Sequence, residues 1–341
     1  MRAIVYSETG PSDVLRLEER PVPEPGPGEV RVRVVVSAVN PTDWKNRSGG
    51  GAAVAAEQTP NQDGAGVVDA VGPGVTAFAP GDRVWSFLSA YQRPGGTAQE
   101  FTVLPVERVV PLPDSASFDA GASMGVPAMT AHRALTVHES GPSRLAPGAL
   151  DGRTVLVAGG AGAVGHAAIQ LAHWAGATVI TTISSDAKAE LARAAGADVV
   201  VNYRTDDAAD RIREAAPDGV DLVVEVSPAR NAGLNARVLA NHGSIAVYAN
   251  DGGDEVTLDV RGHFAINARY QFLLLYTVGQ DALTAAAEDI TAALSDGALG
   301  VGEENGLPLT RFPLERTAEA HDAVEQGTVG KVLIDVAPDA G

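Results

Sequence analysis

Hydrophobic and polar positions alternate along the first part of the chain. Residues 30–36 place apolar side chains between arginines, which is typical of a strand with one buried face. Further strands are predicted at 64–71 and 82–87, each bounded by glycine and proline turns, and a short helix is predicted at 117–124. The pattern therefore predicts a β-rich first domain over residues 1–127.

From residue 128 onward, apolar strands alternate with helical patterns. Strands are predicted at 154–158, 177–183, 198–201, 221–226, 244–249 and 270–276. Helices are predicted at 128–138, 164–175, 186–195, 206–215, 230–240 and 282–294. This alternation predicts an α/β domain over residues 128–299, built on a doubly wound parallel sheet. Six strands complete such a sheet, so residues 300–341, with a helix at 317–325 and a strand at 331–336, are expected to return to the first domain.

A glycine-rich turn follows the predicted strand at 154–158. The residues Gly160-x-Gly162-x-x-Gly165 stand between that strand and an apolar helical pattern. At such a turn, backbone N–H groups and the positive end of a helix can face a phosphate. A side chain would block the diphosphate or hold the helix off the strand. The turn predicts dinucleotide binding, and the alternative is a merely structural turn.

The end of the second strand of this domain bears on the choice of cofactor. NAD sites usually carry an acid there, which holds the ribose 2′-OH. Here the strand ends in Ser184 and Ser185, with Lys188 one turn later, and these groups suit a 2′-phosphate, which favours NADPH over NADH. Asp186 is the competing signal. Alternatively, Ser184 or Ser185 caps the next helix, Asp186 lies in its first turn, and Lys188 is a solvated charge.

Composition excludes several function classes. The 341 residues include no cysteine, and the seven histidines form no His-x-x-x-His pair, so we expect no metal site. The net charge of −18 disfavours nucleic acid and anionic membranes as partners. With no spanning apolar run and no N-terminal signal, the protein is expected to be soluble and cytoplasmic. The small residues at 49–56 are expected to form a mobile loop.

Several motifs occur in a fixed order along essentially the whole chain. They include Val39-Asn40-Pro41-x-Asp43, Asp63-Gly64-Ala65-Gly66-Val67-Val68, Gly81-Asp82-Arg83-Val84, Ala195-Gly196-Ala197-Asp198 and Gly330-Lys331-Val332. With them the sequence resembles the zinc-free, ζ-crystallin-like quinone oxidoreductases of the medium-chain dehydrogenase/reductase superfamily. The resemblance implies a GroES-like catalytic domain plus a Rossmann domain, with the active site in the cleft between them. It also implies NADPH-dependent reduction of quinones or α,β-unsaturated carbonyls in a homodimer.

The resemblance places Asn40 and Asp43 in the active-site segment. An Asn40 amide could donate to a developing enolate oxygen, and Asp43 would orient Asn40 or Lys45 rather than act as an acid. Alternatively, residues 40–43 simply cap a short helix. Three aromatic residues are candidates for flat walls against a substrate ring, or else belong to the core: Trp44, Trp85 and Tyr91.

The chain departs from its relatives shortly after this segment. Many relatives carry a tyrosine there, a candidate donor that faces the substrate, but here the residues are Arg47-Ser48-Gly49-Gly50-Gly51. The departure leaves the proton donor open and suggests a different or roomier pocket, in which solvent supplies the proton. The absence of cysteine fits the zinc-free group, since zinc-dependent relatives hold their metal partly with cysteine.

By resemblance, the cofactor residues are spread over the second domain and the C-terminus. Thr130 is expected near the nicotinamide, and Tyr203 against the adenosine phosphate beside Lys188. The diphosphate is expected at the backbone amides of Ala161, Gly162, Ala163 and Val164. Further candidates are Val226, Ala249 and Asn250 at strand ends, with Tyr276 and Lys331. Each has a structural alternative: Thr130 can bond back into its helix, and Tyr203 can be a surface aromatic.

Two rival functions and one partner remain to be tested. An enoyl-thioester reductase would want a basic patch, which the acidic composition does not offer, and the same charge argues against a non-catalytic RNA-binding role. A non-catalytic NADPH-binding protein is the other rival. Residues 269–278 are apolar and form the expected last strand of the sheet, so this edge is expected to pair with a second copy. The alternative is that a loop or the helix at 282–294 covers the edge.

Overall fold

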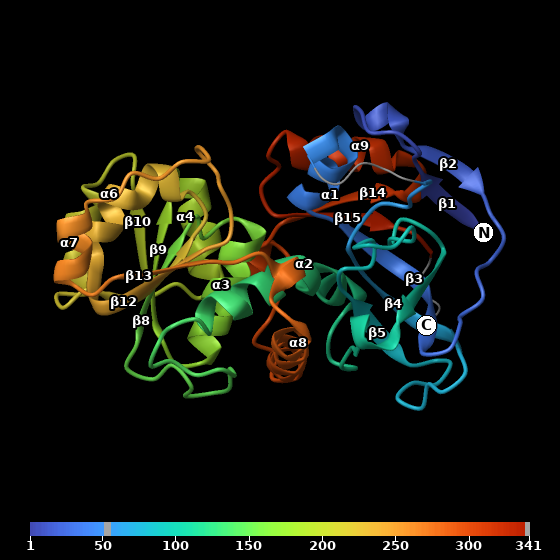
Figure 1. Cartoon of the computed structure of the whole chain (residues 1–341), viewed down its shortest axis with the longest axis horizontal. Coiled ribbons are helices and arrows are strands. Elements are labelled where there is room, and N and C mark those ends of the chain that lie inside the picture. Colours follow the sequence, from blue (N-terminus) through green and yellow to red (C-terminus); the bar gives the residue numbers. More distant parts are fainter. Residues whose placement is uncertain (51–55, 338–341) are drawn as a thin grey trace. The chain divides into compact units, whose positions relative to one another are not determined.

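The computed structural model describes residues 1–50 and 56–337, and the chain divides into two compact units, each with its own sheet (Figure 1). The first unit consists of Met1–Val126 and Leu309–Gly341, and the second of Pro127–Pro308. The return to the first unit begins at Leu309 rather than at residue 300. Most of the segment 49–56, expected to be a mobile loop, lies outside the described residues.

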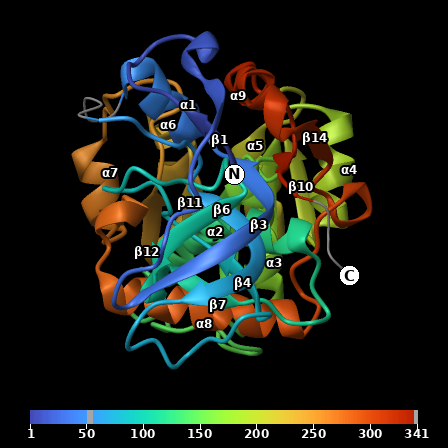
Figure 2. The same ribbon diagram turned by 90° about the vertical axis from the view of Figure 1, so that its right-hand side faces the viewer.

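The first unit contains a seven-stranded sheet in the order β14-β15-β3-β4-β5-β7, and β6 also pairs with β3. Its strands are β3 (Glu29–Val39), β4 (Asp63–Val71), β5 (Arg83–Ser86), β6 (Phe101–Pro105), β7 (Val109–Pro111), β14 (Leu309–Pro313) and β15 (Lys331–Asp335). A separate hairpin consists of β1 (Arg2–Val5) and β2 (Arg16–Glu19). In Figure 2 the long β3 runs across the unit with β4 and β6 on either side of it.

Burial explains why β3 is the centre of this sheet. Its valines from Val30 to Val36 are buried, and the strand then continues through Ala38 and Val39, which are also buried. The C-terminal strand β15 pairs antiparallel with β3, with Val332 opposite Val39. This pairing brings Lys331, near the end of the sequence, beside the residue that follows β3.

Three helices complete the first unit, and one of them continues into the second. They are α1 (Pro41–Lys45), α9 (Thr317–Glu325) and α2 (Phe118–Leu135). Short helical turns lie at Ser12–Val14, Asn46–Gly50, Val106–Arg108 and Leu314–Arg316. The two helices predicted at 117–124 and 128–138 are in fact one helix, α2, which is kinked at Gly125. Pro127 removes one backbone donor, and the result here is a bend rather than a break.

The second unit is a six-stranded parallel sheet in the order β10-β9-β8-β11-β12-β13. Its strands are β8 (Thr154–Ala158), β9 (Thr178–Ile183), β10 (Val199–Asn202), β11 (Val220–Glu225), β12 (Leu239–Val247) and β13 (Arg269–Phe272). Its helices are α3 (Ala163–Trp174), α4 (Asp186–Ala194), α5 (Ala208–Ala215), α6 (Pro228–Val238), α7 (Val260–Ala265) and α8 (Gln280–Ser295), with turns at Leu275–Thr277 and Glu303–Asn305. This order confirms the doubly wound sheet.

In the second unit, the start of β12 and the end of β13 differ most from the prediction. β12 begins at Leu239 rather than at 244, because its first residues pair with β11 before a register shift. β13 ends at Phe272 rather than at 276, and the apolar run continues into a helical turn instead. From β8, successive strands are added first toward β10 on one side and then, from β11, toward β13 on the other side. Such folds bind ligands at the carboxyl ends of the two strands where this order switches, here β8 and β11. Within the described ranges, no helix is long and apolar enough to cross a bilayer.

Candidate functional site

The glycine turn of the second unit has the geometry of a phosphate-binding turn. The N–H groups of Gly159 and Gly160 donate to the Thr182 carbonyl, at 3.1 and 3.3 Å, which ties the turn to the end of β9. A Cβ at Gly160 would lie 2.2 Å from Thr181 Oγ1, so a side chain does not fit there. Gly162 is the N-terminal cap of α3, and the nearest atom to a Cβ there is 3.4 Å away. The turn therefore leaves open backbone in front of a helix N-terminus.

Gly165 explains the last glycine of the motif. A Cβ at this position would lie 2.4 Å from the carbonyl oxygen of Gly159, so only glycine lets α3 pack directly on the turn. Of the other candidate amides, Ala161 directly precedes the capping residue Gly162, and Ala163 and Val164 lie between Gly162 and Gly165. A diphosphate requires a turn whose backbone is not covered by side chains. The glycines present here leave such a turn, so the residues fit a dinucleotide.

The residues predicted to select the cofactor come together at the end of β9. Tyr203 N–H donates to the Ile183 carbonyl at 3.1 Å, so Tyr203 lies beside Ser184. Ser185 accepts a hydrogen bond from Lys188 N–H at 3.4 Å and caps α4. The capping interpretation is therefore confirmed for Ser185, with Asp186 in the first helical turn.

The side chains at this edge are accessible. Tyr203 is 52% exposed, and Lys188 and Ser184 are half-buried. Over residues 1–50 and 56–337 the Lys188 ammonium forms no ion pair or hydrogen bond. The edge thus presents a hydroxyl, a cation and an aromatic ring next to the glycine turn.

The residues at the ends of β11 and β12 also border the turn. A Cβ at Gly159 would lie 3.5 Å from Val226 Cγ1, which places Val226 against the glycine turn. Asp251 N–H donates to the Val226 carbonyl at 3.1 Å, so the segment with Ala249 and Asn250 lies alongside. This is the edge at which a doubly wound sheet binds its ligand.

Glu225 at the end of β11 is a residue that sequence reasoning missed. It is fully buried, and its carboxylate accepts bonds from Ser227 N–H at 2.6 Å and from the amides of Asn231 and Asn235 at 2.9 and 2.6 Å. These bonds hold the start of α6 and the backbone around Val226. A lone acid at the end of an apolar strand was the available signal. Burial and the nearby Glu225 charge also raise the pKa of Tyr248.

In the first unit, Asp43 organises the segment after β3. Its Oδ2 accepts a hydrogen bond from Asn40 N–H at 2.7 Å, and its Oδ1 accepts one from Gln62 N–H at 3.1 Å. Pro41 begins α1 directly after Asn40. The Asp43 carboxylate therefore caps the start of this helix and orients the Asn40 backbone.

The Asn40 side chain lies between a carboxylate and an ammonium group. Its Nδ2 donates to Asp63 Oδ2 at 2.7 Å, and its Oδ1 accepts from Lys331 Nζ at 2.5 Å. All three residues are at most 2% exposed. Lys331, predicted as a cofactor residue, is thus a buried hydrogen-bond partner of Asn40. In the sequence, Asp63 stands out only as part of the motif at residues 63–68.

Charge is concentrated in this buried cluster of Asn40, Asp43, Asp63 and Lys331. Burial and the neighbouring Asp63 raise the pKa of Asp43 to about 8. Burial raises the pKa of Asp63 to about 6, and the Lys331 charge opposes that rise. Burial lowers the pKa of Lys331, against the pull of both carboxylates. Burial and the mutual charges of the two acids and the one cation therefore shift all three pKa values, which sets the cluster apart from surface ion pairs.

The three aromatic candidates have different surroundings. Trp85 is fully buried in β5 and packs on Phe87 with ring centroids 5.9 Å apart, so it is core and not a substrate wall. Trp44 is half-buried, with the Lys45 ammonium 5.9 Å from its ring centroid. Tyr91 is half-buried beneath the Arg108 guanidinium, at 5.8 Å. Of the three, Trp44 and Tyr91 keep an accessible face.

Arg47, which stands where many relatives carry a tyrosine, is buried. Its side chain is 1% exposed, and its Nη2 donates to Glu325 Oε2 at 2.7 Å. It therefore offers no group to a substrate in the manner of an exposed tyrosine hydroxyl. Thr130 is buried on α2, and Tyr276 is half-buried in the turn after β13.

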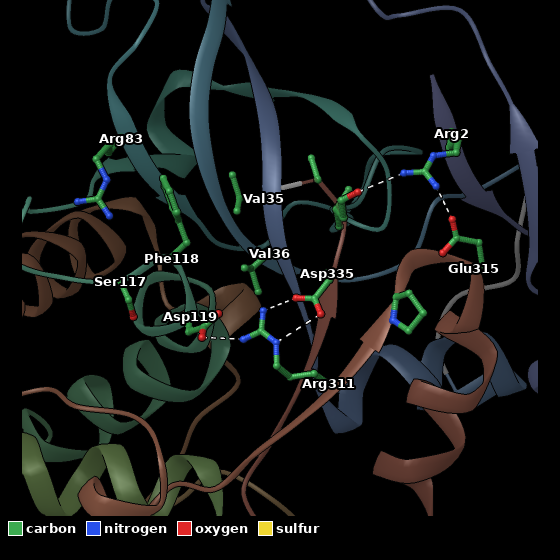
Figure 3. A pocket seen from close by; sticks show the side chains of 13 residues that line it. Arg2, Val35, Val36, Arg83, Ser117, Phe118, Asp119, Arg311, Glu315 and Asp335 are labelled. Atoms are coloured by element: carbon green, nitrogen blue, oxygen red, sulfur yellow. Dashed lines mark hydrogen bonds and ion pairs between the residues drawn. The ribbon is translucent and has the colours of Figure 1, made fainter. Parts of the chain in front are cut away.

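Among the described residues of the first unit, two surface pockets lie away from the predicted site residues. One of about 560 Å³ is lined by arginines and acids, and Figure 3 shows Arg311 between Asp119 and Asp335 and Arg2 beside Glu315. Because each of these charges is already paired, the pocket has no polar group that calls for a ligand.

Comparison with known proteins gives matches over the whole chain. The family model described as alcohol dehydrogenase GroES-like domain matches residues 26–114, and the one described as zinc-binding dehydrogenase matches residues 163–291. A quinone oxidoreductase of Rattus norvegicus is 32% identical over 98% of this chain and 97% of its own length.

Two solved structures extend the comparison. A structure described as an NAD-dependent alcohol dehydrogenase has a TM-score of 0.86 and 32% identity, and covers 99% of this chain and 100% of its own. A mycobacterial protein complexed with NADPH has a TM-score of 0.81 and 32% identity, with 98% and 99% covered. These similarities identify an oxidoreductase.

The second family description raises the question of a zinc site. The sequence has no cysteine, and the described part of the chain contains no group of three histidine or acidic side chains placed to hold a metal. The positions next to Asn40 carry amide, carboxylate and ammonium groups that bond one another. The residues therefore do not fit the metal that the second family description implies.

Proposed function

The chain belongs to the quinone oxidoreductase family of the medium-chain dehydrogenases/reductases, and we propose that it is an NADPH-dependent, metal-independent reductase of quinones or α,β-unsaturated carbonyls. The observation that carries the proposal is the carboxyl edge of the parallel sheet in the second unit, where the glycine turn meets the end of β9. There the glycine turn is hydrogen-bonded to the end of β9. Ser184 follows that strand, Lys188 lies in the first turn of α4, and Tyr203 follows β10 and donates its N–H to Ile183.

Each part of the dinucleotide has a proposed partner on this edge. The open backbone at Ala161–Val164, ahead of α3, receives the diphosphate. Lys188 and Ser184 receive the 2′-phosphate, and Tyr203 lies against the adenosine. Ser185 caps α4 and contributes through its backbone position. Bound NADPH supplies the hydride.

The proposed class of acceptor follows from two features of this chain, namely the absence of cysteine ligands for a metal and the hydrogen-bond donor of the Asn40 amide. A conjugated acceptor sends charge to a distant oxygen when hydride arrives, so it needs a hydrogen-bond donor rather than a metal. The Asn40 amide carries two hydrogens, and Asp63 accepts one of them. We assign the second to the developing oxyanion, with the Lys331 charge on Oδ1 polarising the amide. With Arg47 buried, solvent supplies the proton.

A homodimer is part of the proposal. β13 is the last strand in the order of its sheet. Four apolar side chains in and around this strand are each more than half exposed: Val260, Phe264, Phe272 and Leu274. An open edge with an apolar border is a surface that a second copy can extend.

The proposal is tested by a panel of acceptors. Purified protein, treated with chelator, is assayed for NADPH and NADH oxidation with quinones, 2-alkenals and an enoyl thioester. The proposal expects turnover with a quinone or alkenal and a preference for NADPH. Turnover with the thioester alone would identify the rival enoyl reductase. Binding of NADPH without turnover of any acceptor would favour a non-catalytic binding protein.

A further inference from the structure

Asp63 lies where three distant parts of the first unit meet. Its Oδ2 accepts hydrogen bonds from Asn40 Nδ2 at 2.7 Å and from Val126 N–H at 2.8 Å. Lys331 holds the other end of the same Asn40 amide at 2.5 Å. Because Asp63 is fully buried, these contacts are shielded from solvent. One carboxylate oxygen therefore joins the segment after β3 to α2.

The hydrogen bond from Val126 N–H to Asp63 lies where α2 departs from regular helical geometry. Gly125 has φ −49° and ψ −105°, outside the helical range, and Pro127 has no N–H to donate. A Cβ at Gly125 would lie 2.1 Å from Asp63 Oδ1, so only glycine lets the carboxylate approach the backbone this closely. Within the described chain, that buried Oδ1 has no hydrogen-bond partner. The kink of α2 is built around the Asp63 carboxylate.

The kink coincides with the passage of the chain from one compact unit to the next. Val126 is the last residue of the first unit, and Pro127 is the first of the second. Thr130, which the family resemblance associates with the nicotinamide, follows about one helical turn later on α2. Asp63 therefore contacts Asn40 on one side, and on the other the backbone that leads to Thr130.

We propose that Asp63 is a positioning residue for the reaction: it holds the Asn40 amide and the kink of α2 in fixed relation, and Lys331 provides the buried positive charge that this carboxylate requires. The inference rests on the proposed function. An unpaired buried carboxylate is costly, so a charge retained at this point needs a compensating cation. Lys331 on β15 is linked to Asp63 by the Asn40 side chain, which bonds both residues. The Asp43 carboxyl on α1 also interacts with the Lys331 charge and so competes with Asp63 for it.

Asp63→Ala tests this role with two readouts. The first is hydrogen–deuterium exchange of the peptide that contains Val126, which should be faster by about tenfold or more, the effect of losing one charge-assisted hydrogen bond. The second is steady-state kinetics with NADPH and an active acceptor. We expect kcat to fall by about tenfold or more with the NADPH KM within about twofold, because the cofactor edge is untouched. Asp63→Asn keeps an acceptor oxygen and should restore part of both.

Leu104→Ala is the matched control. Leu104 is a fully buried core residue of the same unit, and its truncation lowers stability without touching the cluster, so it should lower the melting temperature and leave Val126 exchange and kcat unchanged. Unchanged exchange or unchanged kcat in an Asp63→Ala protein that folds would overturn the inference. If Asp63→Ala does not fold, wild-type kcat and exchange in Asp63→Asn and in Lys331→Met together overturn it. A wild-type protein without reductase activity would instead refute the proposed function, and Val126 exchange would still decide whether Asp63 holds the kink.

Discussion

Replacement of Lys188 by alanine tests how the chain selects its cofactor. The Lys188 side chain is half-buried in the first turn of α4, the helix that follows β9 and Ser184. A hydrogen bond to a charged group contributes about 1.5–3 kcal/mol. Because the side chain is partly exposed, solvent screens the contact, and we take about 1–2 kcal/mol for the loss. The NADPH Kd should therefore rise by about 5- to 30-fold, and the NADH Kd by less than about twofold.

The assay is fluorescence titration of both cofactors at fixed ionic strength. Arg193→Ala is the control, because it removes the same charge from the same helix, where Arg193 is paired with Glu190 at 2.5 Å. Arg193→Ala should change neither affinity by more than about twofold, since an exposed ion pair contributes little. An equal loss of NADPH and NADH affinity in Lys188→Ala would refute the reasoning, as would an effect no larger than that of Arg193→Ala.

Four other results are expected. Gly165→Ala should weaken NADPH binding by at least about tenfold by isothermal calorimetry, because its Cβ would lie 2.4 Å from the Gly159 carbonyl; wild-type affinity would contradict the turn assignment. Leu274→Lys should lower the mass found by light scattering toward one subunit of 34.9 kDa, unless the wild type is itself monomeric. Chelator should leave activity unchanged, and activity restored only by added zinc would refute metal independence. Asp289→Asn should cost about 2 kcal/mol of unfolding free energy at pH 7 and less near pH 3, measured with urea; a cost that does not vary with pH would be contrary to the charge argument.

The sign of the Asp289 effect follows from its hydrogen bonds. Burial alone would raise the pKa of Asp289, but bonds from His132, Arg144 and Leu145 N–H lower it to about 2. A carboxyl group with a depressed folded-state pKa contributes stability above its unfolded value of 3.8, and this contribution is lost as the pH falls toward 2.

Local sequence rules were sufficient for the second unit. The alternation of strands and helices predicted the doubly wound order, and the glycine spacing predicted a turn at which a side chain does not fit at Gly160 or Gly165. These features depend on residues within one β-strand, turn and helix, so periodicity and turn chemistry report on them directly. Element ends were less certain, as at β13, where apolar character continues past the last paired residue.

The buried cluster of the first unit could not be predicted from local patterns. Lys331 reaches Asn40 only because β15 pairs antiparallel with β3, a contact between residues nearly the whole chain apart. A lysine in an apolar strand gives no sign of which group it meets. Asp63 was visible as a motif residue, but its role depends on the kink at Gly125, which sequence predicted as a break between two helices. Long-range pairing decides such sites.

The central claim is that this protein transfers a hydride from NADPH to a conjugated acceptor without a metal. The most direct test uses NADPH deuterated at C4, metal-stripped protein and a quinone or 2-alkenal that the acceptor panel shows to be active. For the alkenal, we expect one deuterium at the β-carbon of the saturated product by mass spectrometry, with no requirement for added zinc. A product without deuterium, or transfer that appears only when zinc is restored, would contradict the account.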